Sequence, residues 1–185
     1  MERREFLKAG AAAASLLTIP VTARAQRGTE QAKLARLAIM SLSFGAIFKN
    51  ANQPDSPARV VDIMDIGEMY ADRYGVHNVE LQHTHLPSTE ESWLKEFRAR
   101  LAKSKSQVTN INLEFGGTMT ISAESPVGRL QAVDLTKRWI DHAVVLGSPR
   151  LMVNQGQPTE QNKAVSVAAL KAMGDYGRLK GVMVG

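Results

Sequence analysis

Seven polar side chains, gathered in three short segments, have the chemistry to bind a small molecule. Carboxylate, amide and imidazole groups stand within or just after apolar runs, where successive strands would deliver them to one edge of a sheet. The candidate substrate-binding residues are Glu80, Gln82, His83, His85, Asn112, Glu114 and Asn154. From the sequence we assign no catalytic residue and no metal ligand.

The two histidines are the candidates best suited to hold an ion. His83 and His85 are two positions apart on a segment expected to be extended, so their side chains should point the same way. Together they can share a metal ion or a phosphate, since imidazole is the commonest metal ligand among side chains. Zinc takes three or four protein ligands, however, and two histidines leave such a site incomplete. Contact with a substrate or a loop role is therefore the main interpretation.

The carboxylates and the amide each have a structural alternative. Glu80 can orient the hydroxyl groups of a ligand or pair with a nearby Arg or Lys. Glu114 is followed by Gly116 and Gly117, which let the backbone turn sharply and leave the mouth of a site open. Asn154 suits hydrogen bonding to hydroxyl groups and equally suits capping a loop.

Apolar runs and helical patterns alternate along residues 35–185. Strands are expected at residues 35–44, 77–83, 108–115, 150–154 and 182–184. Helices are expected to begin near Ser56, the Ser88–Glu91 capping box, Pro126 and Thr159. Three of them are expected to end at Gly75, Gly147 and Gly181. This alternation predicts an α/β fold with a parallel sheet.

Two architectures fit that alternation, an open doubly wound sheet and a (β/α)8 barrel. No G-x-G-x-x-G motif follows the first strand, so dinucleotide binding has no support, but a flavodoxin-like sheet has a suitable length. Parallel strands buried on both faces normally read as continuous apolar runs. Here Asn112 and Glu114 alternate with Ile111 and Leu113. A barrel accounts for this pattern, because polar groups can collect on its inner wall near the active-site mouth.

The first 25 residues are expected to be an export signal. Arg3-Arg4-Glu5-Phe6-Leu7-Lys8 resembles the R-R-x-F-L-K motif of bacterial twin-arginine signals. An apolar run from Ala9 to Ile19 follows, well short of the ~20 residues that cross a bilayer. Ala23-Arg24-Ala25 is a peptidase cleavage site of the usual kind. We expect a periplasmic or extracellular protein, with residues 26–34 as a polar tether.

Composition narrows the choice of partners. Removing residues 1–25 takes away four basic and two acidic residues, so the formal net charge falls from +5 to +3. The remaining basic residues are scattered, whereas nucleic-acid binding requires a concentrated basic face. We expect no nucleic-acid partner and, after signal cleavage, no membrane partner. The chain has no cysteine, so packing alone must stabilise it in an oxidising compartment.

Several motifs in order resemble the sugar phosphate isomerase/epimerase family, whose fold is the xylose isomerase-like TIM barrel. They are Val79-Glu80-Leu81, Asn110-Ile111-Asn112-Leu113-Glu114, the helix from Arg129 to Gly147, Leu151-Met152-Val153-Asn154, and Ala169 to Gly181 before Val182-Met183-Val184. The resemblance covers most of residues 35–185. It implies a partial barrel of four to five βα units and a carbohydrate ligand.

The resemblance also implies metal-assisted aldose–ketose isomerisation or epimerisation by a full-length relative. The family's divalent metal is held by carboxylates and histidines, the first at the end of strand five and the others later. The sequence stops before that point, so most ligands are absent and isomerase activity depends on further strands. A metal-dependent phosphodiesterase such as endonuclease IV is a lesser possibility.

Two alternatives to an enzyme remain from the sequence. One is a non-catalytic carbohydrate-binding or assembly module, which could form a homo-oligomer through open sheet edges. The other is an inactive fragment of a longer reading frame.

Overall fold

The computed structural model describes residues 30–49 and 56–185. The chain divides into two units, residues 1–37 and residues 38–185. In the first unit residues 30–34 are helical, in the segment predicted to be a polar tether. The predicted export signal lies outside the described residues. Within the described ranges no helix combines the length and the apolar character needed to cross a membrane.

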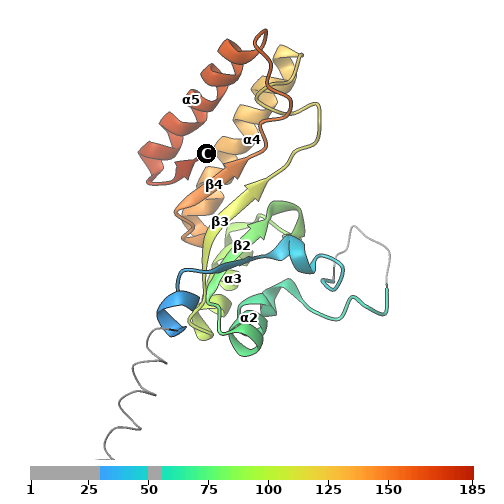
Figure 1. Cartoon of the computed structure of the whole chain (residues 1–185), viewed down its shortest axis with the longest axis vertical. Coiled ribbons are helices and arrows are strands. Elements are labelled where there is room, and N and C mark those ends of the chain that lie inside the picture. The colour runs from blue at the N-terminus through green and yellow to red at the C-terminus, as the bar shows by residue number, and fades with distance from the viewer. Residues whose placement is uncertain (1–29, 50–55) are drawn as a thin grey trace, which may run out of the picture. The chain divides into compact units, whose positions relative to one another are not determined.

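The second unit is built on one parallel sheet of five strands. Its strands are β1 (Ala38–Met40), β2 (Asn78–Gln82), β3 (Gln107–Leu113), β4 (Arg150–Val153) and β5 (Met183–Val184). Their order in the sheet is β1-β2-β3-β4-β5, and Figure 1 shows β2, β3 and β4 side by side with the same direction. A doubly wound sheet reverses its strand order at a switch point, whereas a barrel keeps it sequential. The fold is therefore a partial (β/α)8 barrel, and the flavodoxin-like alternative is wrong.

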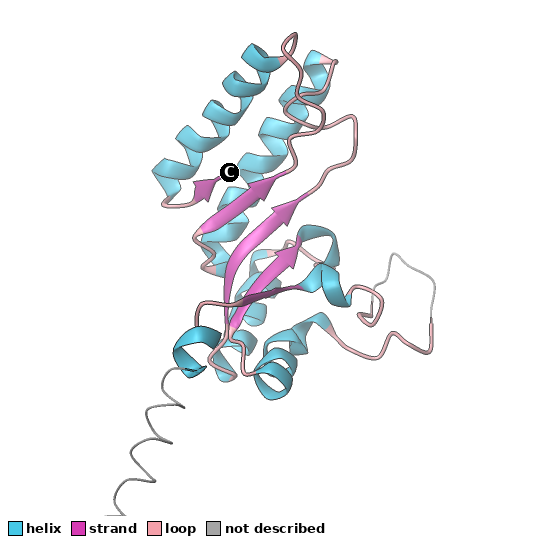
Figure 2. Cartoon of the chain, viewed as in Figure 1, coloured by secondary structure: helices cyan, strands magenta, loops and turns pink. Residues whose placement is uncertain are grey.

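Four α-helices connect the strands and pack against one another in chain order (Figure 2). They are α2 (Ile66–Tyr74), α3 (Glu91–Lys103), α4 (Pro126–Leu146) and α5 (Lys163–Lys180). The three short 3-10 helices are η1 (Ser41–Phe44), η2 (Ile63–Asp65) and η3 (His83–His85). Helices α2, α4 and α5 end at Gly75, Gly147 and Gly181, as the sequence predicts.

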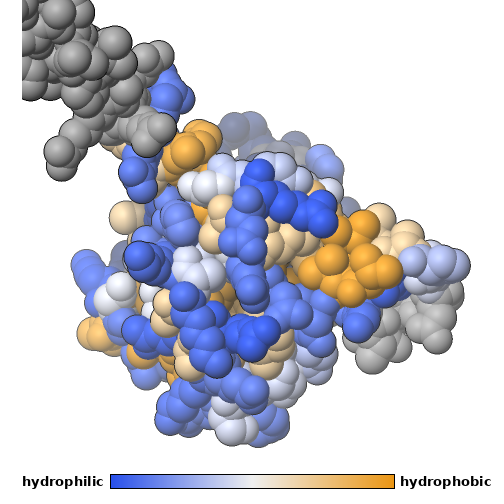
Figure 3. Space-filling view, turned by 90° about the horizontal axis from the view of Figure 1, so that it is seen from below, coloured by the Kyte–Doolittle hydropathy of each residue, from blue (hydrophilic) through white to orange (hydrophobic). Residues whose placement is uncertain are grey.

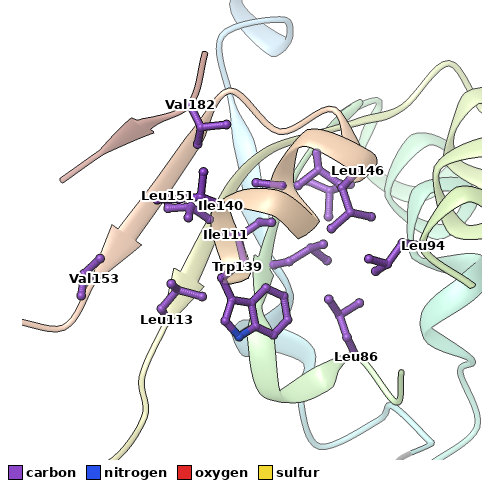
Figure 4. Close-up of a cluster of buried hydrophobic side chains, with 14 of the residues drawn as sticks. Leu86, Leu94, Ile111, Leu113, Trp139, Ile140, Leu146, Leu151, Val153 and Val182 are labelled. Carbon is purple, nitrogen blue, oxygen red and sulfur yellow. The ribbon is translucent and has the colours of Figure 1, made fainter. Parts of the chain in front are cut away.

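The core lies between the sheet and these helices. Ile111 of β3 pairs in register with Leu151 of β4, and both side chains are buried. Figure 4 shows them beside Ile140 and Trp139 of α4. Burying apolar area in this way is the main stabilising contribution, about 25 cal/mol for each Å² removed from water. The alternation of apolar and polar residues in β3 is confirmed, because one face of the sheet packs against helices.

On β4 and β5 the opposite face of the sheet is exposed within the described part of the chain. Met152 of β4 pairs with Asn112 of β3 and is 43% exposed, while Met183 of β5 is 67% exposed. In a complete barrel this face points inward and is filled by layers of side chains. Elsewhere exposed apolar side chains lie between hydrophilic ones, as in the view from below in Figure 3.

One predicted helix begins later than the sequence suggests. We expected a helix from Ser56, but the chain there forms a turn, and α2 begins at Ile66 after η2. The reason is a parallel bridge between Phe48 and Val61, in which the Val61 N–H donates to the Ile47 carbonyl at 3.0 Å. Phe48 is buried, so this pairing holds the segment before η2 extended.

The other differences are at element boundaries. The first strand was expected to reach Phe44, but Ser41–Phe44 is the 3-10 helix η1. Ser88 and Glu91 form no capping box, since the Ser88 hydroxyl accepts from the Glu90 N–H at 3.1 Å and α3 begins with no side-chain cap. At α4 the expected start is confirmed, with Ser125 accepting from the Gly128 N–H.

Candidate functional site

Polar side chains collect on the face of the sheet opposite the helices, toward the carboxyl ends of the strands. Glu80 pairs in register with Asn110, and Gln82 pairs with Asn112. Paired residues of parallel strands share a face, so these four side chains lie opposite the helix-packed one. In (β/α)8 barrels the carboxyl ends of the strands carry the active site. The structure therefore brings Glu80, Gln82 and Asn112 to one wall of a barrel mouth.

Gln82 and Asn112 form a buried amide pair. Their exposed fractions are 3% and 7%, and the Asn112 Nδ2 donates to the Gln82 Oε1. A buried amide needs such a partner, because an unsatisfied one costs about 1–3 kcal/mol. The pair fixes the floor of the mouth between β2 and β3. That either residue contacts a substrate directly stays a prediction.

The two histidines do not point the same way, and the expectation of an extended segment here is wrong. Residues 83–85 form η3, so each ring meets different neighbours. The His83 Nδ1 accepts from the Glu114 backbone N–H at 3.3 Å, and its ring lies edge-on to Phe115 and Trp139. The His85 Nδ1 lies 3.0 Å from the Ser41 Oγ instead. Each histidine therefore ties its loop to a neighbouring element.

Ser41 is a residue of this site that sequence reasoning missed. Its side chain is fully buried, and its hydroxyl oxygen accepts from the Gln82 N–H at 2.8 Å while contacting His85. It thus connects the end of β1 to the end of β2 and positions the His85 ring. No local signal marks Ser41, because its partners are some 40 residues away in the sequence.

A cleft of about 930 Å³ opens between the loops that follow β3 and β4. Of the predicted residues, Glu114 and Asn154 line it, while the other five do not. The structure adds polar lining residues that sequence reasoning had not singled out: Thr120, Ser122, Thr159 and Asn162. A cleft of this size, with several convergent polar groups, suits a small-molecule ligand.

The two loops that form the cleft are bonded to each other. The Ser122 Oγ donates to the Gln155 carbonyl at 2.6 Å, and the Asn162 Nδ2 donates to the Ser122 carbonyl at 3.0 Å. Both Thr120 and Ser122 are buried against Gly156. These contacts hold the walls in place without a ligand, so the cleft is preorganised.

Glu114 and Asn154 form a matched acceptor and donor on one wall. The Asn154 Nδ2 donates to the Glu114 Oε1 at 3.3 Å, while the Asn154 Oδ1 accepts from the Gly156 N–H at 2.9 Å. The second bond fixes the amide orientation, since the backbone N–H requires the oxygen to face it. A carboxylate accepts up to about four hydrogen bonds, so Glu114 can accept further hydrogen bonds from a ligand in the cleft.

Acidification from pH 7 to pH 5 is expected to lower the free energy of unfolding through the mouth histidines. Burial lowers the pKa of His83 and of His85 below the ordinary value of 6.5. Between the folded and ordinary pKa values the unfolded chain binds protons that the folded chain does not, so stability decreases as the pH is lowered. The free energy of unfolding should change by less than about 1.4 kcal/mol per pH unit for each histidine, because both rings are partly exposed.

Urea denaturation across this pH range measures the effect. His83→Asn should reduce the pH dependence of the free energy of unfolding while retaining an acceptor for the Glu114 N–H. His77→Asn is the matched control, since His77 lies on the surface at the opposite end of β2. An unchanged slope in His83→Asn would show that other groups cause the pH dependence.

Comparisons with known proteins agree on the fold. No protein-family model matches the chain, and no curated protein matches it either. An L-ribulose 3-epimerase structure is similar with a TM-score of 0.63 and 17% identity, covering 82% of this chain and 48% of that one. A D-psicose 3-epimerase from Clostridium cellulolyticum H10, solved with D-tagatose, gives 0.61 and 13%, with coverages of 80% and 50%.

A xylose isomerase domain protein from Planctomyces limnophilus is similar with a TM-score of 0.53 and 18% identity, covering 63% of this chain and 46% of that one. The chain spans about half the length of these structures. Identities this low establish the fold alone. The fold is that of the xylose isomerase-like barrels, represented here by the first five strands.

The described residues do not fit a divalent metal on their own. Among them no three His, Asp or Glu side chains gather closely enough to hold an ion. His83 and His85 are each engaged with different partners. A metal centre in this fold would need ligands beyond those that the described residues provide.

Proposed function

We propose that the protein is an exported sugar isomerase or epimerase, in which this part of the barrel supplies one wall of the substrate site. The observation that carries the proposal is the preorganised polar cleft at the carboxyl ends of β3 and β4. Sugars present neighbouring hydroxyl groups, each able to donate and to accept a hydrogen bond. Glu114 and Asn154 offer a complementary acceptor and donor.

In this proposal each group of residues has a separate task. Glu114 and Asn154 orient two sugar hydroxyls at the wall. The buried pair of Gln82 and Asn112 keeps the floor rigid. Moving a proton between neighbouring carbons needs a positioned acid or base, and orientation of the sugar determines which carbon it meets.

A sugar assay with product analysis tests the proposal. The purified protein is incubated with D-tagatose or L-ribulose, with and without a divalent cation, and the products are separated by chromatography. Formation of an epimer or of the corresponding aldose, reduced at least about tenfold by Glu114→Ala, supports it. Absence of both turnover and sugar binding would contradict it.

The second candidate is a non-catalytic carbohydrate-binding module. It requires only the polar cleft and the matched pair of Glu114 and Asn154. Binding of sugar without turnover, with or without added cations, would select this alternative. The same cleft would then serve recognition alone.

Export through the twin-arginine pathway is also a proposal, and it is supported by the motif at Arg3 and Arg4. Intact mass spectrometry of the exported fraction tests it. A mature N-terminus at Gln26 is expected, and a chain that retains Met1 in that fraction would contradict cleavage at Ala25. The measured mass also tests whether the native protein is heavier than the 20.2 kDa of this chain.

A further inference from the structure

Charged side chains of both signs line the cleft. Its described lining includes two carboxylates, on Glu114 and Glu124, and one guanidinium, on Arg129. The Arg129 Nη1 donates to the backbone carbonyls of Ala123 and Glu124, so it fastens the start of α4. The charged side chains that line the cleft therefore sum to a net negative charge. The Arg129 guanidinium, the one cation among the described lining residues, is already bonded to backbone carbonyls of the cleft wall.

The two helices that begin at the rim of the cleft differ in their capping. At the start of α4 the Gly128 N–H donates to the Ser125 hydroxyl. In the turn before α5 the Thr159 N–H donates to the Asn162 Oδ1 at 2.7 Å, but no side chain caps the first turn of α5 itself. A helix N-terminus attracts anions through its unpaired N–H groups, and the Ser125 cap reduces that attraction at α4.

Glu114 is the carboxylate placed to meet a ligand. Its side chain is exposed into the cleft, and one oxygen accepts from Asn154. A vicinal diol fits this pair, since one hydroxyl can donate to the carboxylate while the next accepts from the amide. A phosphate offers no donor to the carboxylate when fully ionised, and its charge is repelled.

We propose that the cleft binds an uncharged sugar and rejects the phosphorylated form, with Glu114 as the residue that discriminates between them. The inference rests on the proposed function and narrows its substrate class. It also distinguishes this wall from a phosphate-binding site in which a Lys or Arg faces the ligand, because Arg129 is bonded to the backbone instead.

Titration calorimetry at constant ionic strength tests the proposal with three probes: D-tagatose, D-tagatose 6-phosphate and inorganic phosphate. D-tagatose is expected to bind at least about tenfold more tightly than its phosphate ester, and inorganic phosphate should not compete. Glu114→Gln removes the charge and keeps the shape. It should weaken D-tagatose binding and bring the ratio of the two affinities at least about threefold closer to one.

Glu124→Gln is the matched control, because it removes the other cleft carboxylate from the rim and leaves the pair of Glu114 and Asn154 intact. It should change the preference by less than Glu114→Gln does, because Glu124 contributes only longer-range charge and no contact with the diol. Tighter binding of the phosphate ester, competition by inorganic phosphate, or an unchanged preference in Glu114→Gln would overturn the discrimination and leave the sugar-processing proposal standing. If neither sugar nor ester binds, both proposals fail. Circular dichroism of each variant confirms that the fold is retained.

Discussion

Replacing Ile111 with alanine is expected to lower the free energy of unfolding by about 2–5 kcal/mol. Ile111 is fully buried at the centre of the sheet, on β3 between β2 and β4. The change removes apolar contacts with the α4 side of the core and leaves a cavity that the strand cannot close by moving, since both neighbouring strands hold it. Urea denaturation with an unchanged m-value measures the loss.

Met152→Ala is the matched control for that experiment. Met152 lies on the neighbouring strand β4 but on the uncovered face of the sheet, with 43% of its surface exposed. Its replacement should cost less than about 1 kcal/mol. Equal losses for the two variants would show that the uncovered face is buried in solution, by further strands or by a second copy of the chain.

The fold class could be predicted because the signals for it are local. Alternating polar and apolar residues in β3 set one face against the helices, and this requires only the two-residue period of a strand. Gly147 and Gly181 mark helix ends, and Ser125 followed by Pro126 marks a start. What the local pattern left open was the choice between a sheet and a barrel, and only the strand order decided it.

The segments that the sequence failed to predict are held by distant partners. The chain around Phe48 stays extended because it pairs with Val61. The strand β1 gives way to η1 at Ser41, whose hydroxyl bonds with Gln82 and His85 on the next βα unit. A propensity or capping rule that reads a few neighbouring residues has no access to such bonds.

The candidate site was predicted in part for the same reason. Residue types at strand ends are readable from the sequence, and the seven candidates follow β2, β3 and β4 or lie within them. Their division into a rigid floor and an open wall is not readable, because it depends on which side chains bond to each other. Gln82 and Asn112 hydrogen-bond to each other, whereas Glu114 and Asn154 line a cleft that is formed by two separate loops.

Gly156→Ala is expected to weaken sugar binding at least about tenfold, which corresponds to 1.4 kcal/mol. Gly156 has a φ of +72°, and a Cβ added there would lie 2.6 Å from the Ser122 Oγ and closer still to the Thr120 Oγ1. Both hydroxyls belong to the facing loop and are buried, so the loop after β4 must move away from it. That movement separates Asn154 from Glu114 and widens the cleft.

Gly181→Ala isolates the conformational part of this effect. Gly181 has nearly the same φ, +74°, but nothing in the described structure lies within 4 Å of an added Cβ. It should lose about 1–2 kcal/mol of stability from the left-handed conformation alone and keep its sugar affinity. Gly156→Ala should lose about 1–3 kcal/mol more, because it adds a steric clash to the same strain. If both variants bind sugar like the parent protein, the packing of these two loops does not shape the ligand site, and the cleft would have to be assigned a different role.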